Sequence, residues 1–166
     1  MMSNTSVQAK PKPHDVMAWS ELDDDFIKAF AADRKSLGLA VRKKVDRDAA
    51  LDRYETEIFT VTRRPHPTIS DAVIESKKII SDDHSGISDI FDAMTNGYAY
   101  DRKGWWGHGS GTFKPSRPGS MYKETFANLW AMRNDPVTWA KCERLFPRLC
   151  ARFDEVIQQL KRNGYR

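Results

Sequence analysis

Residues 104–133 read GWWGHGSGTFKPSRPGSMYKETFANLWAMR. This segment begins with a tryptophan pair and a glycine-flanked histidine, continues as a polar loop, and ends in a run with helical periodicity. Ser120 is a suitable N-cap for that helix, because its hydroxyl can accept hydrogen bonds from free N–H groups of the first turn. A stripe at helical spacing follows, made of Tyr122, Phe126, Leu129, Trp130 and Arg133. The segment therefore predicts a long loop followed by a helix over 120–133.

Glu124 lies beside that stripe on the predicted helix. A carboxylate among aromatic and aliphatic side chains lies either at the solvated edge of a helix or in a binding site. If Glu124 is buried, it requires a metal ion, an arginine or a hydroxyl as a partner, because an unpaired buried charge is costly. The simpler alternative, a partly solvated glutamate on an amphipathic helix, stays open from the sequence.

The length and composition of the chain indicate one globular domain. Its 166 residues are 40% hydrophobic and 30% charged, which is typical of a chain with a buried core. Residues 1–13 are polar and contain two prolines, so we expect a flexible N-terminal tail followed by a single domain over 14–166. No apolar run approaches the roughly 20 residues of a membrane-spanning helix, so no membrane partner is expected. The first residues lack the apolar segment of a secretory signal, so we expect a cytoplasmic or virion-associated protein.

Net charge and cysteine content constrain the function only weakly. The net charge of +4 and the pI near 9.1 permit contact with nucleic acid or with an acidic partner, but acids and bases are interleaved along the chain. Cys142 and Cys150 form no CxxC motif and stand near aromatic residues, so we expect reduced cysteines in the core.

The spacing of apolar residues predicts a mainly α fold, a compact helical domain with room for one small β-hairpin around 58–63 or 98–106. Ser20 and Ser88 are expected N-caps, and Gly38 is a suitable helix stop. The residues between 98 and 119 are expected to form a long loop, and a loop of that length in a compact domain is often functional. The predicted helices cover residues 20–37, 41–59, 70–81, 88–97, 120–133, 135–145 and 149–163.

The chain has four histidines, and no two of them stand four residues apart: they are His14, His66, His84 and His108. The sequence therefore lacks the HExxH motif, in which two histidines on one helix face bind zinc. His108 is the most informative of the four, because Gly107 and Gly109 permit unusual backbone angles and close approach of a ligand.

Four short motifs occur in a fixed order along the chain. They are SDIFDAMTNG at 88–97, GHG at 107–109, ETFA at 124–127 and LFP at 145–147. In this order they resemble the C-terminal part of lethal-factor-like zincins, and more closely the metallopeptidase-like domains of phage minor head proteins and related toxins. The resemblance covers residues 14–162 and is best over 86–160.

The resemblance implies roles for several residues. Glu124 corresponds to the helix glutamate that is the third zinc ligand of such enzymes, and His108 or Tyr122 would steady the oxyanion. His14 stands where the second histidine of HExxH is expected, which makes it the remaining candidate metal ligand.

The segment around His14 departs from the family pattern. Lys10 replaces the first histidine, and Pro11 replaces the catalytic glutamate. Pro11 and Pro13 are also incompatible with the helix that presents HExxH. Without that glutamate a zincin lacks the base that activates water, so the expected cofactor is none, with zinc as the alternative.

Three functions follow from these observations. The first is a degenerate metallopeptidase-like domain, a pseudoenzyme that binds a phage or host protein and serves in the virion or in head morphogenesis. The second is an active metal-dependent hydrolase that uses Glu124 and His108. The third is a small basic protein that binds nucleic acid or an acidic host protein. The partner-binding residues in the first and third cases would be Arg102, Lys103, Trp105, Trp106, Lys114 and Arg117. The alternative for the two tryptophans is a place in the core.

Overall fold

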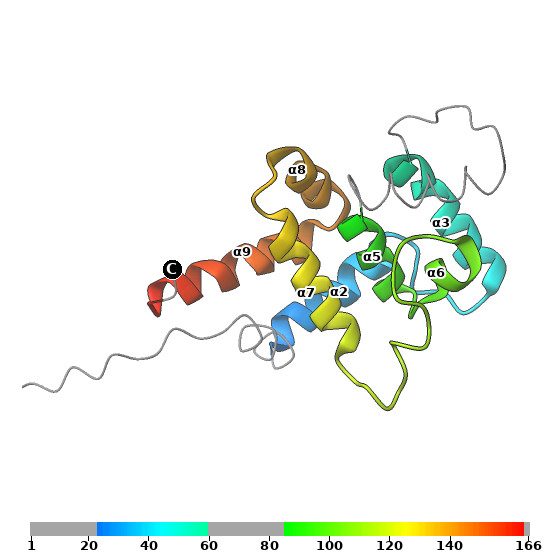
Figure 1. Ribbon diagram of the computed structural model, residues 1–166, viewed down its shortest axis with the longest axis horizontal. Helices are drawn as coiled ribbons and strands as arrows, with labels where there is room; N and C mark the ends of the chain where they lie inside the picture. The colour runs from blue at the N-terminus through cyan, green and yellow to red at the C-terminus, as the bar shows by residue number, and fades with distance from the viewer. Residues whose placement is uncertain (1–22, 60–84, 165–166) are drawn as a thin grey trace, which may run out of the picture.

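The chain folds into a helical assembly. The computed structural model describes residues 23–59 and 85–164, and within these ranges it contains seven helices and no strand (Figure 1). The prediction of a mainly α fold is therefore confirmed. In chain order the helices are α2 (Asp24–Ser36), α3 (Lys44–Phe59), α5 (Ser85–Met94), α6 (Tyr98–Lys103), α7 (Ser120–Met132), α8 (Pro136–Leu145) and α9 (Pro147–Arg162).

Helix α9 is the central element of the packing. It contacts α2, α7 and α8, and α7 crosses it in the view of Figure 1. One stripe of α9 is buried, made of Leu149, Phe153, Val156 and Leu160. These residues recur every three or four positions, which places them on a single face of the helix. The helix that was predicted over 149–163 is confirmed.

Aromatic rings connect α9 to the helices around it. The ring of Phe126 on α7 lies 5.7 Å from that of Phe26 on α2 and 5.1 Å from that of Phe153 on α9. A second group joins α5 to the junction of α8 and α9, because Phe91 lies 5.3 Å from Phe146 and 5.5 Å from Trp105. Such pairs each contribute about 0.5–1.5 kcal/mol beyond their buried area. The loop that contains Trp105 is thus fixed to the core.

A buried carboxylate holds the start of α9 against α2. The side chain of Asp33 is fully buried and accepts hydrogen bonds from the backbone N–H groups of Leu149 (2.8 Å) and Arg148 (3.4 Å). The N-cap of α9, Phe146, provides no side-chain acceptor. Asp33 therefore satisfies free N–H groups of α9 from a neighbouring helix and places a negative charge at the positive end of the α9 dipole.

Several predicted helix boundaries agree with the structure. Gly38 follows α2 in the left-handed region with φ +74°, which favours glycine. Asp135 caps α8, and Pro136 is its first residue. The predicted start at Ser20 is wrong for α2, which begins at Asp24 with Asp23 as its N-cap, because the Asp23 carboxylate accepts from the Phe26 N–H. The predicted tail over 1–13 and the predicted helix over 70–81 lie outside the described residues.

The predicted hairpin at 98–106 is wrong. Residues 98–103 form the short helix α6, and the Thr95 hydroxyl oxygen accepts a hydrogen bond from the Ala99 N–H at its start. Tyr98 and Tyr100 fit a strand by composition, but this side-chain acceptor stabilises a helical turn instead. At the other proposed hairpin, residues 58–59 belong to α3, and 60–63 are outside the described ranges.

Two predicted caps are also wrong. Helix α5 begins at Ser85, so Ser88 lies inside the helix and is buried. Helix α7 has Gly119 as its N-cap, and Ser120 is its first residue. The Ser120 hydroxyl donates to the carbonyl oxygens of Thr112 and Arg117, which ties the end of the preceding loop together. The hydroxyl groups of both serines therefore hold the loop and do not cap a helix.

The two cysteines lie in the core. Cys142 and Cys150 are free and buried, as expected, and burial raises the pKa of Cys142 to about 12. Among the described residues, no helix combines the length and the apolar character that crossing a membrane requires.

Replacement of Asp33 tests the contact between α2 and α9. Asp33→Asn should lower the free energy of unfolding by about 1–3 kcal/mol. The substitution replaces one of the two oxygens that accept from the Arg148 and Leu149 N–H groups by an NH2 group, which cannot accept. The matched control is Asp154→Asn, whose carboxylate pairs with Arg133 at the surface and should cost less than about 1 kcal/mol. Urea unfolding followed by circular dichroism measures both. Equal losses in the two variants would contradict this role of Asp33.

Candidate functional site

Helix α5 buries an unusual set of polar side chains. Among its apolar residues, Ser88, Asp89 and Asp92 are buried, and Thr95 is buried just after its end. Buried polar groups require hydrogen-bond partners, and a buried carboxylate requires several. The partners of these residues identify what α5 organises.

Asp92 organises the loop that follows α6. Its carboxylate accepts hydrogen bonds from three backbone N–H groups, those of Tyr100 (2.9 Å), His108 (2.9 Å) and Gly109 (3.2 Å). Burial raises the pKa of Asp92, and these three donors act in the opposite direction. One fully buried carboxylate thereby joins α5, α6 and the GHG segment.

Other contacts hold the two sides of the same loop. The Ser88 hydroxyl donates to the Trp106 carbonyl oxygen at 3.0 Å, and Asp101 accepts from the Ser110 N–H at 3.1 Å. The Trp105 side chain is 1% exposed and packs edge-on against Phe91. The backbone on both sides of His108 is therefore fixed to α5, to α6 and to the core.

The glycines of this loop are required by space. A Cβ atom on Gly107 would overlap with the Asp92 carboxylate, and a Cβ atom on Gly97 would overlap with the backbone of Gly109 and Ser110. Gly97 and Gly109 also have positive φ angles of 83° and 71°. Glycine at these positions lets the loop approach α5 closely enough for Asp92 to reach its N–H groups.

The held loop brings His108 to two carboxylates. Its Nε2 atom lies 3.2 Å from Oε2 of Glu124 and 3.8 Å from Oδ2 of Asp89. One ligand atom from each of the three side chains lies within 4.8 Å of the others. Glu124 comes from the second turn of α7, which packs against α5. Three separate elements thus converge on one point.

Asn128 fixes the carboxylate side of the group. Its side-chain amide donates to Oδ2 of Asp89 at 3.0 Å and to the backbone carbonyl oxygen of Glu124 at 2.8 Å. Oδ1 of Asp89 is buried and has no hydrogen-bond partner within the part of the chain that the structure describes. A cation would satisfy such an oxygen.

The electrostatics of the group follow from its burial. Burial raises the pKa of Asp89 to about 6, and the nearby Glu124 and Asp92 carboxylates act in the same direction. The hydrogen bond from Asn128 and the charge of His108 lower the pKa of Asp89 in part. The side chain of Asp89 is 9% exposed and that of His108 is 49% exposed, so the group opens to solvent on the histidine side.

These three side chains fit a divalent cation. One imidazole nitrogen and two carboxylate oxygens suit zinc, and three protein ligands leave a fourth position for water, as in catalytic zinc sites. Without a metal, a histidine next to a carboxylate can act as an acid–base pair. Both possibilities use the same three residues.

The structure brings together only some of the predicted site residues. The structure brings His108 and Glu124 together, whereas the ring of Tyr122 packs against Phe30 on α2 at 5.1 Å. Tyr122 lies two residues from Glu124, which on a helix directs the two side chains to different faces. His14 lies outside the described residues.

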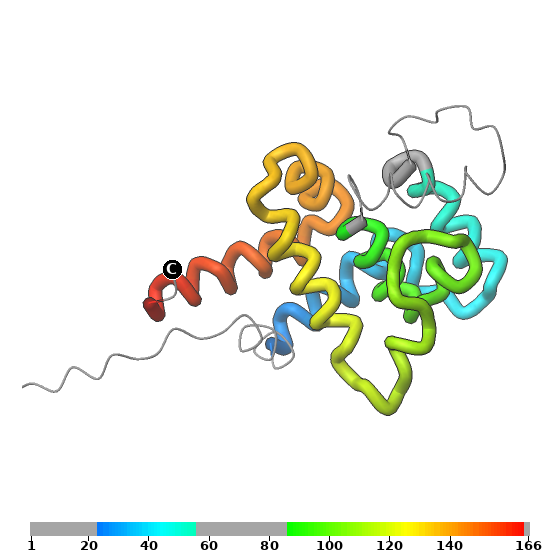
Figure 2. Tube along the Cα trace, viewed as in Figure 1, coloured from blue at the N-terminus to red at the C-terminus, as the bar shows by residue number. Residues whose placement is uncertain are grey.

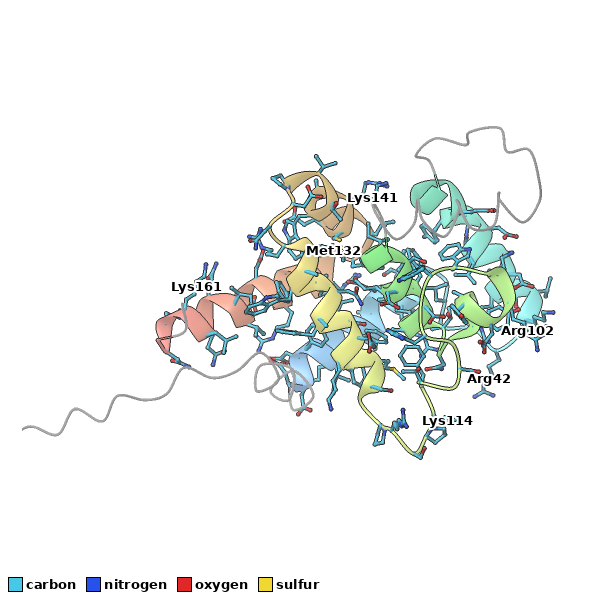
Figure 3. All side chains as sticks on the ribbon, viewed as in Figure 1. Arg42, Arg102, Lys114, Met132, Lys141 and Lys161 are labelled. Atoms are coloured by element: carbon cyan, nitrogen blue, oxygen red, sulfur yellow. The ribbon has the colours of Figure 1, made fainter. Side chains whose placement is uncertain are left out.

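The predicted partner-binding residues differ in how exposed they are. Trp105 is buried, so its ring is not available to a partner, and the core alternative holds for this residue. Trp106 is 37% exposed, and Lys103 forms an ion pair with Asp52 of α3. The exposed cations that remain are Arg102 on α6, and Lys114 and Arg117 on the loop before α7. Figure 3 places Lys114 at the tip of that loop, and Figure 2 follows the loop from α6 into α7.

The sequence analysis did not identify Asp89, Asp92 or Asn128. The available signal was a pair of acidic residues, Asp89 and Asp92, three positions apart in the otherwise apolar run ISDIFDAM. Residues three apart share a helix face, so two acids within a buried helix indicate a specific polar partner. For Asn128, the spacing of four from Glu124 was the corresponding signal.

Comparisons with the models of protein families, with curated proteins and with solved structures found no match for this chain.

Substitution of Gly107 tests how the loop is held. Gly107→Ala should lower the free energy of unfolding by about 1–3 kcal/mol, because the methyl group displaces the Asp92 carboxylate from its N–H donors. The matched control is Gly111→Ala in the same loop, where an added Cβ meets no atom within 4 Å. Urea unfolding measures both variants. A Gly107→Ala protein as stable as the Gly111→Ala protein would contradict this account of the loop.

The raised pKa of Asp89 predicts a pH dependence of stability in metal-free protein. The folded state binds a proton more tightly than the unfolded state, so stability should be lost as the pH rises from about 4 through about 6. The contribution of this carboxyl is roughly 3 kcal/mol. Asp92 and Glu124 also face Asp89, so the comparison with Asp89→Asn isolates its share. Parallel stability–pH curves for the two proteins, measured with a chelator present, would refute the prediction.

Proposed function

We propose that this protein is a metal-dependent hydrolase whose centre consists of Asp89, His108 and Glu124. The observation that carries the proposal is the convergence of three ligand atoms from α5, α7 and the GHG loop within 4.8 Å. Zinc fits this mixture of one imidazole and two carboxylates best among the common divalent cations.

The electrostatic repulsion between the Asp89 and Glu124 carboxylates supports a bound cation. Two carboxylates held near each other raise the free energy of the ionised state, and Oδ1 of Asp89 is buried without a partner among the described residues. A divalent cation offsets both the repulsion and the missing interaction. The Asp92 contacts keep the histidine backbone in place, so little ordering is needed when a metal binds.

The three side chains have distinct roles in this proposal. Asp89, anchored by Asn128, and Glu124, on a packed helix, supply the carboxylate ligands, and His108 supplies the imidazole from the solvent side. A zinc ion held by three protein ligands lowers the pKa of a bound water and polarises a substrate carbonyl or phosphoryl oxygen. The half-exposed His108 marks the side from which a substrate approaches.

The centre differs from that of the zincins that the sequence resembles. The resemblance implies a zinc ligand at Glu124, but Asp89 lies on a segment outside HExxH. A hydrolase on this centre would therefore use a ligand set built from SDI, GHG and ETFA instead of the missing motif.

The competing proposal is a degenerate metallopeptidase-like domain that binds a partner protein in a phage particle or during its assembly. It uses the same fold and the same loop, but it requires no metal at the three residues. Zinc binding therefore separates the two proposals.

Zinc affinity of the untagged protein tests the proposal. Calorimetric titration of chelator-treated protein should give one zinc per chain, and Glu124→Gln and Asp89→Asn should each weaken binding at least about tenfold. Glu143→Gln on α8 is the control, because it removes the same charge from an exposed carboxylate that accepts from the Trp139 ring N–H. Circular dichroism verifies that each variant is folded.

The outcome of that titration decides between the proposals. No zinc in the wild type, or equal binding by Glu124→Gln and Glu143→Gln, would contradict the metal centre. Zinc binding without hydrolysis of peptide or phosphodiester substrates would leave a metal-binding domain and refute the enzymatic part.

A further inference from the structure

The part of the chain that contains His108 has an excess of positive charge. Residues 102–123 include five basic residues and no acidic one, whereas the whole chain has 27 basic and 23 acidic residues. Lys103 is paired with Asp52 of α3. The others include Arg102, Lys114 and Arg117, which are all exposed. The surface formed by this segment therefore favours an anionic partner.

Hydrogen bonds join the basic part of this loop to the proposed metal centre. The Thr112 hydroxyl donates to the His108 carbonyl oxygen at 3.2 Å, and the Thr112 carbonyl oxygen accepts from the Ser120 hydroxyl at 3.2 Å. Ser120 is the first residue of α7, and Glu124 lies about one turn further along the same helix. Residues 113–119 thus form an excursion of the loop that is closed at its base beside two of the three ligands.

The excursion over 113–119 has a defined shape. Phe113 at its beginning is buried, and the Arg117 N–H donates to the Lys114 carbonyl oxygen at 2.9 Å, which makes a turn. Two prolines in the same seven residues each restrict a backbone angle. Figure 3 shows Lys114 at the tip of the excursion. The backbone that carries these two exposed cations is therefore ordered before an anion binds, which lowers the entropic cost of binding.

Two exposed aromatic rings flank the GHG segment. Tyr100 is 40% exposed, and a Cβ atom on Gly109 would lie 3.1 Å from its Cδ1 atom, so the ring lies against the residue that follows His108. Trp106, two residues before His108, is 37% exposed. In the part of the chain that the structure describes, Trp130 is the one other exposed aromatic residue. Exposed rings beside cations suit nucleic-acid bases, whereas an acidic peptide would use the cations alone.

We propose that the substrate of the metal centre is a phosphodiester in single-stranded nucleic acid, a proposal that rests on the proposed hydrolase function. Lys114 and Arg117 contact backbone phosphates beside the reacting one, and Tyr100 stacks on a base. A single strand fits better than a duplex, because stacking on an exposed ring requires an unpaired base. Both cations lie several residues from His108 along the loop, which suits a chain of phosphates and not a single nucleotide.

The reaction is the hydrolysis of one P–O bond. The oxygen of water bonds to phosphorus, the bond from phosphorus to one sugar oxygen breaks with its electron pair on that oxygen, and a proton from the water ends on the same oxygen. The products are a phosphate monoester and a sugar hydroxyl, without oxidation or reduction. Because the Asp89 and Glu124 carboxylates repel a phosphate in metal-free protein, the affinity for the strand should rise when zinc is bound.

Fluorescence anisotropy of a labelled oligothymidylate of about ten nucleotides tests binding to the zinc-loaded, full-length protein. Lys114→Gln combined with Arg117→Gln should weaken binding at least about tenfold and lower the slope of log affinity against log salt by about 1.4, since each phosphate contact contributes about 0.7. Tyr100→Leu should weaken binding at least about fivefold and leave that slope unchanged. The matched control combines Lys161→Gln with Arg162→Gln at the exposed end of α9, far from Lys114 in Figure 3, and should stay within about twofold.

Cleavage of the same strand is the second readout. The zinc-loaded wild type should shorten the oligothymidylate or an oligouridylate of equal length, and comparison of the two distinguishes DNA from RNA. Glu124→Gln, prepared in the same way, should not cleave either strand, which excludes a contaminating nuclease. Polyglutamate of matched charge should compete poorly, because it offers no bases to Tyr100.

The two levels of the proposal fail in different ways. If the protein binds zinc but neither strand, if it binds a strand without cleaving it, or if the loop variants bind as the wild type does, the substrate assignment is overturned and the metal centre stands. Equal competition by polyglutamate overturns it in favour of an acidic peptide. If no zinc binds, the metal centre and its substrate are both refuted, and salt-dependent binding in chelator would leave a nucleic-acid surface only.

Discussion

The arrangement of the candidate site depends on one buried carboxylate. Asp92 is fully buried and accepts backbone hydrogen bonds from Tyr100, His108 and Gly109. A buried carboxylate is tolerated only when such donors replace its hydration, and hydrogen bonds to charged groups contribute roughly 1.5–3 kcal/mol each. The hydrogen bond from Tyr100 holds α6 against α5, and those from His108 and Gly109 fix the position of the GHG segment. The position of the imidazole therefore follows from the burial of Asp92.

Helix α5 packs into the core with its apolar residues and holds the candidate site with its polar residues. Its apolar residues pack into the core, where the Phe91 ring contacts Phe146 and Trp105. Its polar residues hold the loop and provide Asp89, and the packing of α5 against α7 brings Glu124 to the same point. The core and the site are thus built by the same helix, so a rigid core gives a rigid set of ligands. Only His108 reaches the group from a loop, and that loop is tied down on both sides.

The sequence predicted those features that arise from local periodicity. The helical class, the stop at Gly38, the start of α8 at Asp135 and the buried stripe of α9 all follow from spacing and capping within a few residues. A shared site for His108 and Glu124 was expected from the family resemblance and not from local spacing. The predictions that failed depend on contacts distant in sequence. Trp105 is covered by Phe91, and Ser88 donates to Trp106, eighteen residues away. Asp89 was missed because its role requires knowing that α5 lies against α7.

Nitrogen NMR of the His108 side chain during a zinc titration tests the central claim most directly. The claim is that the loop held by Asp92 directs Nε2 of His108 at Asp89 and Glu124 as part of one metal centre. The account predicts a large shift of the Nε2 resonance that is complete at one zinc per chain, while Nδ1 keeps its proton. An Nε2 resonance that does not respond to zinc, or metal binding at Nδ1 instead, would contradict it.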